Sequence, residues 1–256
     1  MAAITSSVRE EVLVRDDLGF RFTWQGHAAV ELETRGGKHV IFDPWFGNPL
    51  STKRAEEVTA CDLLLVTHGH GDHLGDAVAI ASRLRPAWPC IHEMSLWLAR
   101  RLPGGADQVM GMNKGGTAAV GRLRVTMVHA DHSAGDWNAD GGVPLYLGEP
   151  VGFVVELDNG RRVYFAGDTD VFGDMALIRE LHRPDVAFLP IGGHYTMGPA
   201  GAARAAALLG VHAVVPIHYG TFPILAGTPD ELRAALGAIG AGNVAVISPR
   251  PGEVVG

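Results

Sequence analysis

Short apolar runs separated by turn residues recur along the chain and predict its strands. Some runs alternate apolar with polar residues, as in a strand with one buried face, whereas others are apolar throughout. Glycine-containing turns such as Gln25-Gly26-His27 and Arg35-Gly36-Gly37 separate the first of them. We therefore expect strands at residues 20–24, 28–33, 38–42, 61–66, 88–92, 123–128, 151–157, 163–166, 186–190 and 213–217.

Helical spacing of apolar residues follows several of these runs, at residues 76–84, 94–102, 174–182, 199–209 and 230–236. Pro199 opens one of these segments and Gly210 follows it, which is the usual asymmetry of helix ends. Because strands and helices alternate through both halves of the chain, they predict an α/β sandwich with helices outside two packed sheets. No linker-like segment interrupts the pattern, so we expect one domain over residues 1–256.

Charge, hydrophobicity and cysteine content exclude several classes of protein. The chain carries 21 basic and 28 acidic residues among 256, a net charge of -7, which argues against a nucleic-acid surface. No stretch is long and apolar enough to span a membrane, and residues 1–18 contain no export segment. Cys61 and Cys90 lie in apolar runs without the spacing of a zinc-thiolate site, which fits a reducing compartment. We expect a cytoplasmic protein with a small-molecule substrate, which could be anionic; the sequence leaves homo-oligomer formation open.

Residues 67–73 read Thr-His-Gly-His-Gly-Asp-His, a density of metal-ligating side chains that packing does not require. The run follows the apolar segment 61–66, so it lies at the C-terminal end of a strand, where ligand sites of sheet proteins tend to form. If the chain stays extended, His68, His70 and Asp72 project to one side and His73 to another. Donors facing two directions suit two metal ions better than one. Imidazole and carboxylate donors are compatible with zinc, manganese, iron or nickel, and zinc is our default.

Three further candidates lie where other predicted strands end, namely His132, Asp168 and His218. Strands of a common sheet deliver their C-terminal residues to neighbouring points, so these side chains should converge. His129 competes with His132 for the middle position, and we favour His132 because His129 still lies at the end of its strand.

At this point the sequence resembles the metallo-β-lactamase superfamily, whose pattern is a His-x-His-x-Asp-His run followed by a separate His, a separate Asp and a final His. It is more closely similar to a branch of uncharacterised metal-dependent hydrolases, related to L-ascorbate-6-phosphate lactonase and N-acyl phosphatidylethanolamine phospholipase D. The resemblance implies a four-layer αββα sandwich. The phrases that carry it are Trp24-Gln25-Gly26-His27, Asp43-Pro44-Trp45, Gly167-Asp168-Thr169, and the segments 190–198 and 217–223.

The resemblance also implies a ligand set for two metal ions. Where the family usually has a doubled serine after the middle histidine, this chain has Ser133-Ala134, which puts any substrate contact of the second hydroxyl in doubt. One ion would be held by His68, His70 and His132 and the other by Asp72, His73 and His218, with Asp168 bridging both.

Such a pair of cations could bind a water, lower its pKa toward about 7 and polarise a carbonyl or phosphoryl oxygen, so hydrolysis is the natural reaction. Asp72 could orient that water or move its proton. His194 and Tyr195 are candidates to protonate a leaving group or stabilise an oxyanion. For His27 and His194, contact with substrate and hydrogen bonding to the backbone are equally favoured. Hydrogen-bonding support of the ligands is expected from Asp43, Thr67, Ser133 and Thr169.

We therefore expect a metal-dependent hydrolase that acts on a small-molecule ester, lactone or phosphoester. A phosphodiesterase is the nearest competing activity. A non-catalytic metal-binding protein of the same fold is a second alternative, and a redox di-iron role is a weaker third. The Gly-, Asp- and Asn-rich segment 134–150 should form an exposed loop that shapes entry to the site.

Overall fold

The computed structural model describes residues 18–104, 107–135 and 143–256. The first 17 residues, where we expected no export segment, and part of the expected 134–150 loop lie outside the described residues. Within the described ranges no helix combines the length and apolar character needed to cross a membrane.

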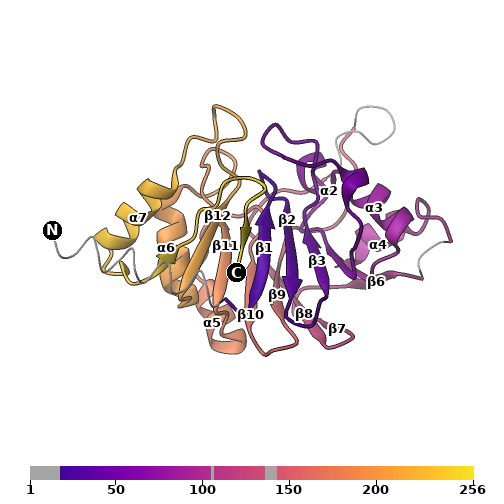
Figure 1. Cartoon of the computed structure of the whole chain (residues 1–256), viewed down its shortest axis with the longest axis horizontal. Helices are drawn as coiled ribbons and strands as arrows, with labels where there is room; N and C mark the ends of the chain where they lie inside the picture. The colour runs from indigo at the N-terminus through magenta and orange to yellow at the C-terminus, as the bar shows by residue number, and fades with distance from the viewer. Residues whose placement is uncertain (1–17, 105–106, 136–142) are drawn as a thin grey trace.

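Two β-sheets organise the chain (Figure 1). In one sheet the strand order is β14 (Val254–Val255), β1 (Phe20–Trp24), β2 (Val30–Thr34), β3 (His39–Phe42) and β4 (Leu63–Leu65). In the other it is β13 (Ala245–Val246), β12 (Ala213–Ile217), β11 (Val186–Pro190), β10 (Arg162–Phe165), β9 (Val151–Glu156), β8 (Leu123–His129) and β7 (Thr117–Val120). A separate pair joins β5 (Trp88–Ile91) to β6 (Val109–Met112).

The two sheets pack face to face through aromatic side chains. Phe22 of β1 contacts Phe188 of β11 with ring centroids 5.2 Å apart, and Phe42 of β3 stacks on Phe165 of β10 at 4.4 Å. All four rings are buried, because in a strand alternate residues face the same side and these positions face the partner sheet. The apolar alternation read from the sequence therefore fills the layer between the sheets.

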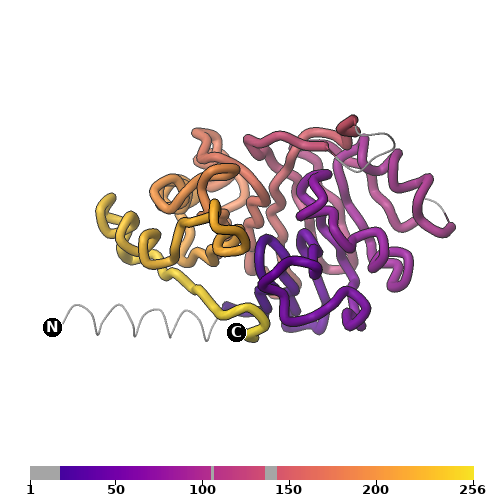
Figure 2. Tube along the Cα trace, turned by 90° about the horizontal axis from the view of Figure 1, so that it is seen from above, coloured from indigo at the N-terminus to yellow at the C-terminus, as the bar shows by residue number. Residues whose placement is uncertain are grey.

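Helices flank the two sheets. Helices α5 (Met175–His182), α6 (Pro199–Leu209) and α7 (Pro229–Ala238) share a core with the outward-facing residues of the seven-stranded sheet, such as Ala187 and Leu189. Helices α3 (Ala77–Leu84) and α4 (His92–Leu98) lie at the opposite end of the molecule (Figure 1), where α4 packs against β5 and β6. This arrangement confirms the expected αββα sandwich. Figure 2 shows the last segment leaving α7 and returning to β1, where β14 pairs antiparallel with it.

Strand direction brings the candidate residues to one edge. Strands β8, β10, β11 and β12 all run the same way, because β9 is antiparallel to both β8 and β10 and the remaining pairs are parallel. The residues that follow β8, β10 and β12 therefore emerge together. Two backbone hydrogen bonds join this edge to the other sheet: Val151 N donates to Thr67 O at 3.0 Å, and His218 N donates to His27 O at 2.8 Å.

The structure differs from the sequence expectations at several short elements. Residues 71–74 form one helical turn, α2 (Gly71–Leu74), so the expectation of an extended chain through the histidine run is wrong. The carbonyl of His70 accepts from the amides of His73 and Leu74, which turns the chain as soon as β4 ends. Elements β6, β7, β13, β14 and the 3-10 turn Ala55–Glu57 were not expected.

Candidate metal centre

Histidine and aspartate side chains gather at this edge in three overlapping groups. Within each group the potential ligand atoms all lie within 4.8 Å of one another. His68 and His73 each belong to two groups, so the groups adjoin. The groups are His68, His70 and His132; His68, His73 and Asp168; and His27, Asp72, His73 and His218. The structure thus brings together all seven metal-ligating candidates of the sequence and adds His27.

The α2 turn separates the donors of the histidine run. His70 caps the turn, and Asp72 and His73 lie within it. His73 is fully buried, whereas 35% of the Asp72 side chain remains exposed. His68 and His70, before the turn, face each other with Nε2 and Nδ1 2.9 Å apart. The donor side chains therefore point in two directions because of a helical turn, and not because of an extended strand as the sequence suggested.

Asp168 lies at the middle of the cluster. Its Oδ2 is 3.1 Å from His218 Nε2 and 3.5 Å from His132 Nε2, and its Oδ1 is 3.3 Å from His73 Nε2. Burial opposes ionisation of Asp168, but its electrostatic interactions and hydrogen bonds with His73 and His218 outweigh burial and hold the pKa of Asp168 well below its usual value. One ionised carboxylate thus contacts imidazoles of all three groups.

Hydrogen bonds fix the orientation of two of the imidazoles. Asp43 is fully buried, and its Oδ2 lies 2.7 Å from His73 Nδ1. The Thr67 hydroxyl donates to the same carboxylate oxygen at 2.8 Å, so it must accept from His68 Nδ1, which lies 3.0 Å away. In both rings Nδ1 carries the proton and Nε2 is turned into the cluster, which is the usual support of metal-binding histidines.

The charge state of the imidazoles follows from burial and from the carboxylates. Burial lowers the pKa of His68 well below its usual value, so this ring is neutral at neutral pH. Burial would also lower the pKa of His73, but Asp168, Asp43 and Asp72 outweigh it and raise that pKa well above 6.5. Without metal, His73 therefore carries a charge that a bound cation would replace.

Several buried polar atoms of the cluster lack hydrogen-bond partners within the described ranges. They include His73 Nε2, Asp168 Oδ1 and both ring nitrogens of His218. An unpaired buried polar atom costs about 1–3 kcal/mol, so such atoms seldom accumulate without reason. A divalent ion would satisfy those that face the cluster, which include only Nε2 of the two His218 nitrogens. Nitrogen and oxygen donors without cysteine suit zinc and other first-row divalent metals. The residues present therefore fit a metal centre.

His27 is the member of the cluster whose role the sequence left open. Its side chain is fully buried, with Nε2 3.0 Å from Asp72 Oδ2 and Nδ1 2.9 Å from Thr221 Oγ1. Burial lowers the pKa of His27 to about 4, so the ring is neutral at neutral pH.

Backbone strain also concentrates here. His27, Asp43 and His218 adopt positive φ angles of 50°, 41° and 54°. This left-handed region is uncommon for residues other than glycine and is typical of functional sites, where the surrounding structure must hold the strain.

The remaining candidates are not members of these groups. His129 is exposed, packs edge-on against Phe172 at 4.8 Å and is absent from the three groups. His194 and Tyr195 are both exposed, and their rings contact each other with centroids 4.5 Å apart. Ser133 is exposed as well, whereas the buried Thr169 accepts a hydrogen bond from Asp131 N.

An aromatic wall stands beside His27, and the sequence analysis did not single it out. Trp45 packs edge-on against His27 at 5.1 Å, and Phe222 lies 6.1 Å from both rings. Phe222 is 40% exposed, so the wall reaches the surface. Both residues fall within phrases that carry the family resemblance, which was the available signal.

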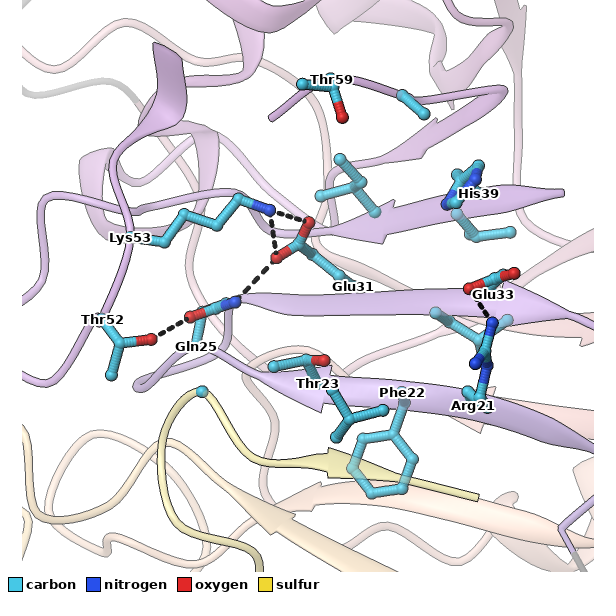
Figure 3. A pocket seen from close by; sticks show the side chains of 16 residues that line it. Arg21, Phe22, Thr23, Gln25, Glu31, Glu33, His39, Thr52, Lys53 and Thr59 are labelled. Atoms are coloured by element: carbon cyan, nitrogen blue, oxygen red, sulfur yellow. Dashed lines mark hydrogen bonds and ion pairs between the residues drawn. The ribbon is translucent and has the colours of Figure 1, made fainter. Parts of the chain in front are cut away.

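A depression lies on the outer face of the five-stranded sheet, over β1 to β3 (Figure 3). Its charged groups pair with one another: Lys53 contacts Glu31 at 2.6 Å, and Arg21 contacts Glu33 at 2.8 Å. Gln25 also donates to Glu31 at 2.8 Å. These partially exposed pairs differ from the unpartnered buried atoms of the His/Asp cluster.

Comparisons with known proteins agree with this geometry. Residues 38–219 match the family model described as the beta-lactamase superfamily domain. The chain is 51% identical to a UPF0173 metal-dependent hydrolase of Archaeoglobus fulgidus, over 91% of this chain and 97% of that protein. It is 49% identical to one of Koribacter versatilis, over 84% and 91%. The structure of Igni18, a novel metallo hydrolase from Ignicoccus hospitalis, matches with a TM-score of 0.80 at 37% identity, covering 92% of this chain and 97% of Igni18.

Proposed function

Because this chain belongs to the beta-lactamase superfamily and, within it, to the UPF0173 family of metal-dependent hydrolases, we propose that it hydrolyses a small-molecule ester, lactone or phosphoester with two divalent ions, zinc by default. The first position would be formed by His68, His70 and His132 and the second by Asp72, His73 and His218, with Asp168 shared between them.

The position of Asp168 carries this proposal. Its two oxygens reach imidazoles of both positions, because His132 belongs to the first and His73 and His218 to the second. A buried carboxylate that lies between imidazoles of both positions is suited to bridge two cations. Its depressed pKa keeps it ionised at neutral pH.

Two bound divalent ions would supply Lewis-acid activation of the scissile bond and a water of lowered pKa. Asp72 is the acid of the cluster that is most open to solvent, so it is placed to accept and release a proton. Asp43 and Thr67 hold His73 and His68 in the tautomers that leave Nε2 available. Trp45 and Phe222 offer an apolar surface for the part of the substrate that does not react.

The test is activity on a panel of aryl esters, lactones and phosphoesters, before and after removal of metal by a chelator. We expect zinc-dependent turnover on at least one class and about two ions per chain. Asp168→Asn should lose both, whereas His212→Gln, at an exposed histidine, should lose neither. Turnover confined to phosphodiesters would instead indicate a phosphodiesterase. Two tightly bound ions without turnover on any class would favour a metal-binding protein that does not catalyse.

A further inference from the structure

We propose that His27 is a fourth protein ligand of the second metal position, beside Asp72, His73 and His218. This inference rests on the proposed dinuclear centre, whose seven ligands do not include His27. It would give the second position an imidazole supplied by the turn between β1 and β2, far from the histidine run in the sequence.

The donor atoms of His27 and Asp72 have the spacing of two ligands of one ion. His27 Nε2 lies 3.0 Å from Asp72 Oδ2, and the ligand atoms of all four residues lie within 4.8 Å of one another. Two donors each about 2.1 Å from an ion, at right angles to each other, are about 3 Å apart. The distance of 2.9 Å between His68 Nε2 and His70 Nδ1, at the first position, is almost the same.

The far nitrogen of His27 has a hydrogen-bond partner, as do those of His68 and His73. Nδ1 of His27 lies 2.9 Å from Thr221 Oγ1, just as Nδ1 of His68 lies 3.0 Å from Thr67 Oγ1. Metal-binding imidazoles nearly always engage their second nitrogen in this way, which fixes the tautomer and turns the free nitrogen toward the ion. If the Thr221 hydroxyl accepts from Nδ1, the Nε2 of His27 is left with a lone pair facing the cluster.

The backbone of His27 is fixed by the same neighbourhood. Its carbonyl accepts from Trp24 Nε1 at 2.9 Å and from His218 N at 2.8 Å, and its φ is 50°. The second of these bonds ties His27 directly to a ligand of the second position. Strain held by such bonds at a buried imidazole indicates a function for that imidazole.

The competing interpretation is that His27 only positions Asp72, by donating its Nε2 proton to the carboxylate. A glutamine can separate the two interpretations, because its amide nitrogen can donate to Asp72 but does not bind zinc. We would therefore compare His27→Gln with the wild-type chain and with His212→Gln. Affinity for the first and second zinc ions would be measured by competition with a chromophoric chelator.

We expect His27→Gln to bind the first zinc ion with wild-type affinity and the second zinc ion at least about 100-fold more weakly. This loss exceeds the roughly 10–100-fold effect of removing a residue that only hydrogen-bonds to a ligand. Thr221→Val should weaken the second ion by an amount within that smaller range. His212→Gln should change neither affinity. Two ions bound by His27→Gln with wild-type affinity would overturn the assignment while leaving the dinuclear centre intact.

A crystal structure of the zinc-loaded wild type provides a measurement that does not depend on a variant folding. A zinc to His27 Nε2 distance of about 2.1 Å supports the assignment, and a zinc ion beyond hydrogen-bonding distance from Nε2 contradicts it. If the wild type saturates at one ion, the dinuclear proposal fails, and the distance from that ion to His27 then decides the ligand assignment. A wild type that binds no ion overturns both.

Discussion

The Asp43 carboxylate lies 2.7 Å from Nδ1 of His73, while the other ring nitrogen of His73 lies 3.3 Å from Asp168. One imidazole therefore stands between two buried carboxylates. Asp43 decides which nitrogen of His73 carries a proton, and so which one is free for a cation.

Replacing Asp43 by asparagine should weaken this control. An amide in place of the carboxylate loses the charge that favours a proton on Nδ1, and it can present a donor to the ring. We expect metal affinity or turnover to fall by roughly 10–100-fold in Asp43→Asn. Chelator competition and steady-state kinetics measure the two effects. Asp230→Asn, at an exposed carboxylate on α7, is the matched control and should behave as the wild type.

The metal-free chain should lose stability as the pH falls from 6.5 to about 4. The pKa of His27 is about 4 in the folded chain and 6.5 when unfolded, so in this window the unfolded state binds more protons. The pKa of His68 is also lower in the folded chain, so His68 adds to this loss. The pKa of His73 is raised in the folded chain, so the stability that His73 contributes is lost only as the pH rises through that pKa. His27 alone accounts for up to roughly 3 kcal/mol.

Urea unfolding of the metal-free wild type and His27→Gln across this pH range tests the assignment. The variant should lose less stability on acidification, because glutamine does not titrate. Parallel curves for the two proteins would show that His27 is not kept neutral by the fold.

Gly167 should be intolerant of a side chain. Its φ is 62°, and a Cβ there would lie 2.6 Å from the Cβ of Thr67, the residue that holds Asp43 and His68. Gly121 has a similar φ of 59°, but an added Cβ there meets no atom of the described residues within 4 Å. We expect Gly167→Ala to be destabilised by roughly 1–3 kcal/mol more than Gly121→Ala, as measured by urea denaturation.

His194 offers a test of leaving-group chemistry that is separate from metal binding. The residue is exposed beside Tyr195 and is not a member of the three donor groups. If it protonates a leaving group, His194→Asn should lower kcat by roughly 10²–10⁴-fold with metal content unchanged. The loss should shrink for substrates with leaving groups that need no protonation. An equal loss for good and poor leaving groups would exclude this role.

The periodicity of apolar residues was enough to predict the main strands and helices. A strand that packs on the other sheet buries every second side chain, and a helix that packs on a sheet buries apolar side chains three or four residues apart. The elements that it missed lack such a signal. Strands β6 and β7 contain no buried residue, and β14 has only two residues. The turn α2 arises from backbone bonds to His70 rather than from apolar spacing.

The donor cluster could be anticipated because its members follow strands in a familiar pattern, but His27 could not. Its contacts are with Asp72, 45 residues away, and with Thr221, 194 residues away. Only the packing of one sheet against the other creates that neighbourhood. Similarly, His129 and His132 could be ranked from sequence, but their surroundings are set by the loop after β8.

The hydrogen bonds from Val151 to Thr67 and from His218 to His27 cross between the sheets at the edge where the donors collect. Cations held there would link the two sheets of the sandwich, since the donor residues follow strands of both sheets. Removal of the ions should then allow this edge to open locally while the aromatic layer between the sheets stays packed. Backbone amide hydrogens at this edge should therefore be the first to exchange with solvent. Removal of the ions would therefore abolish catalysis and weaken the association of the two sheets at the same time.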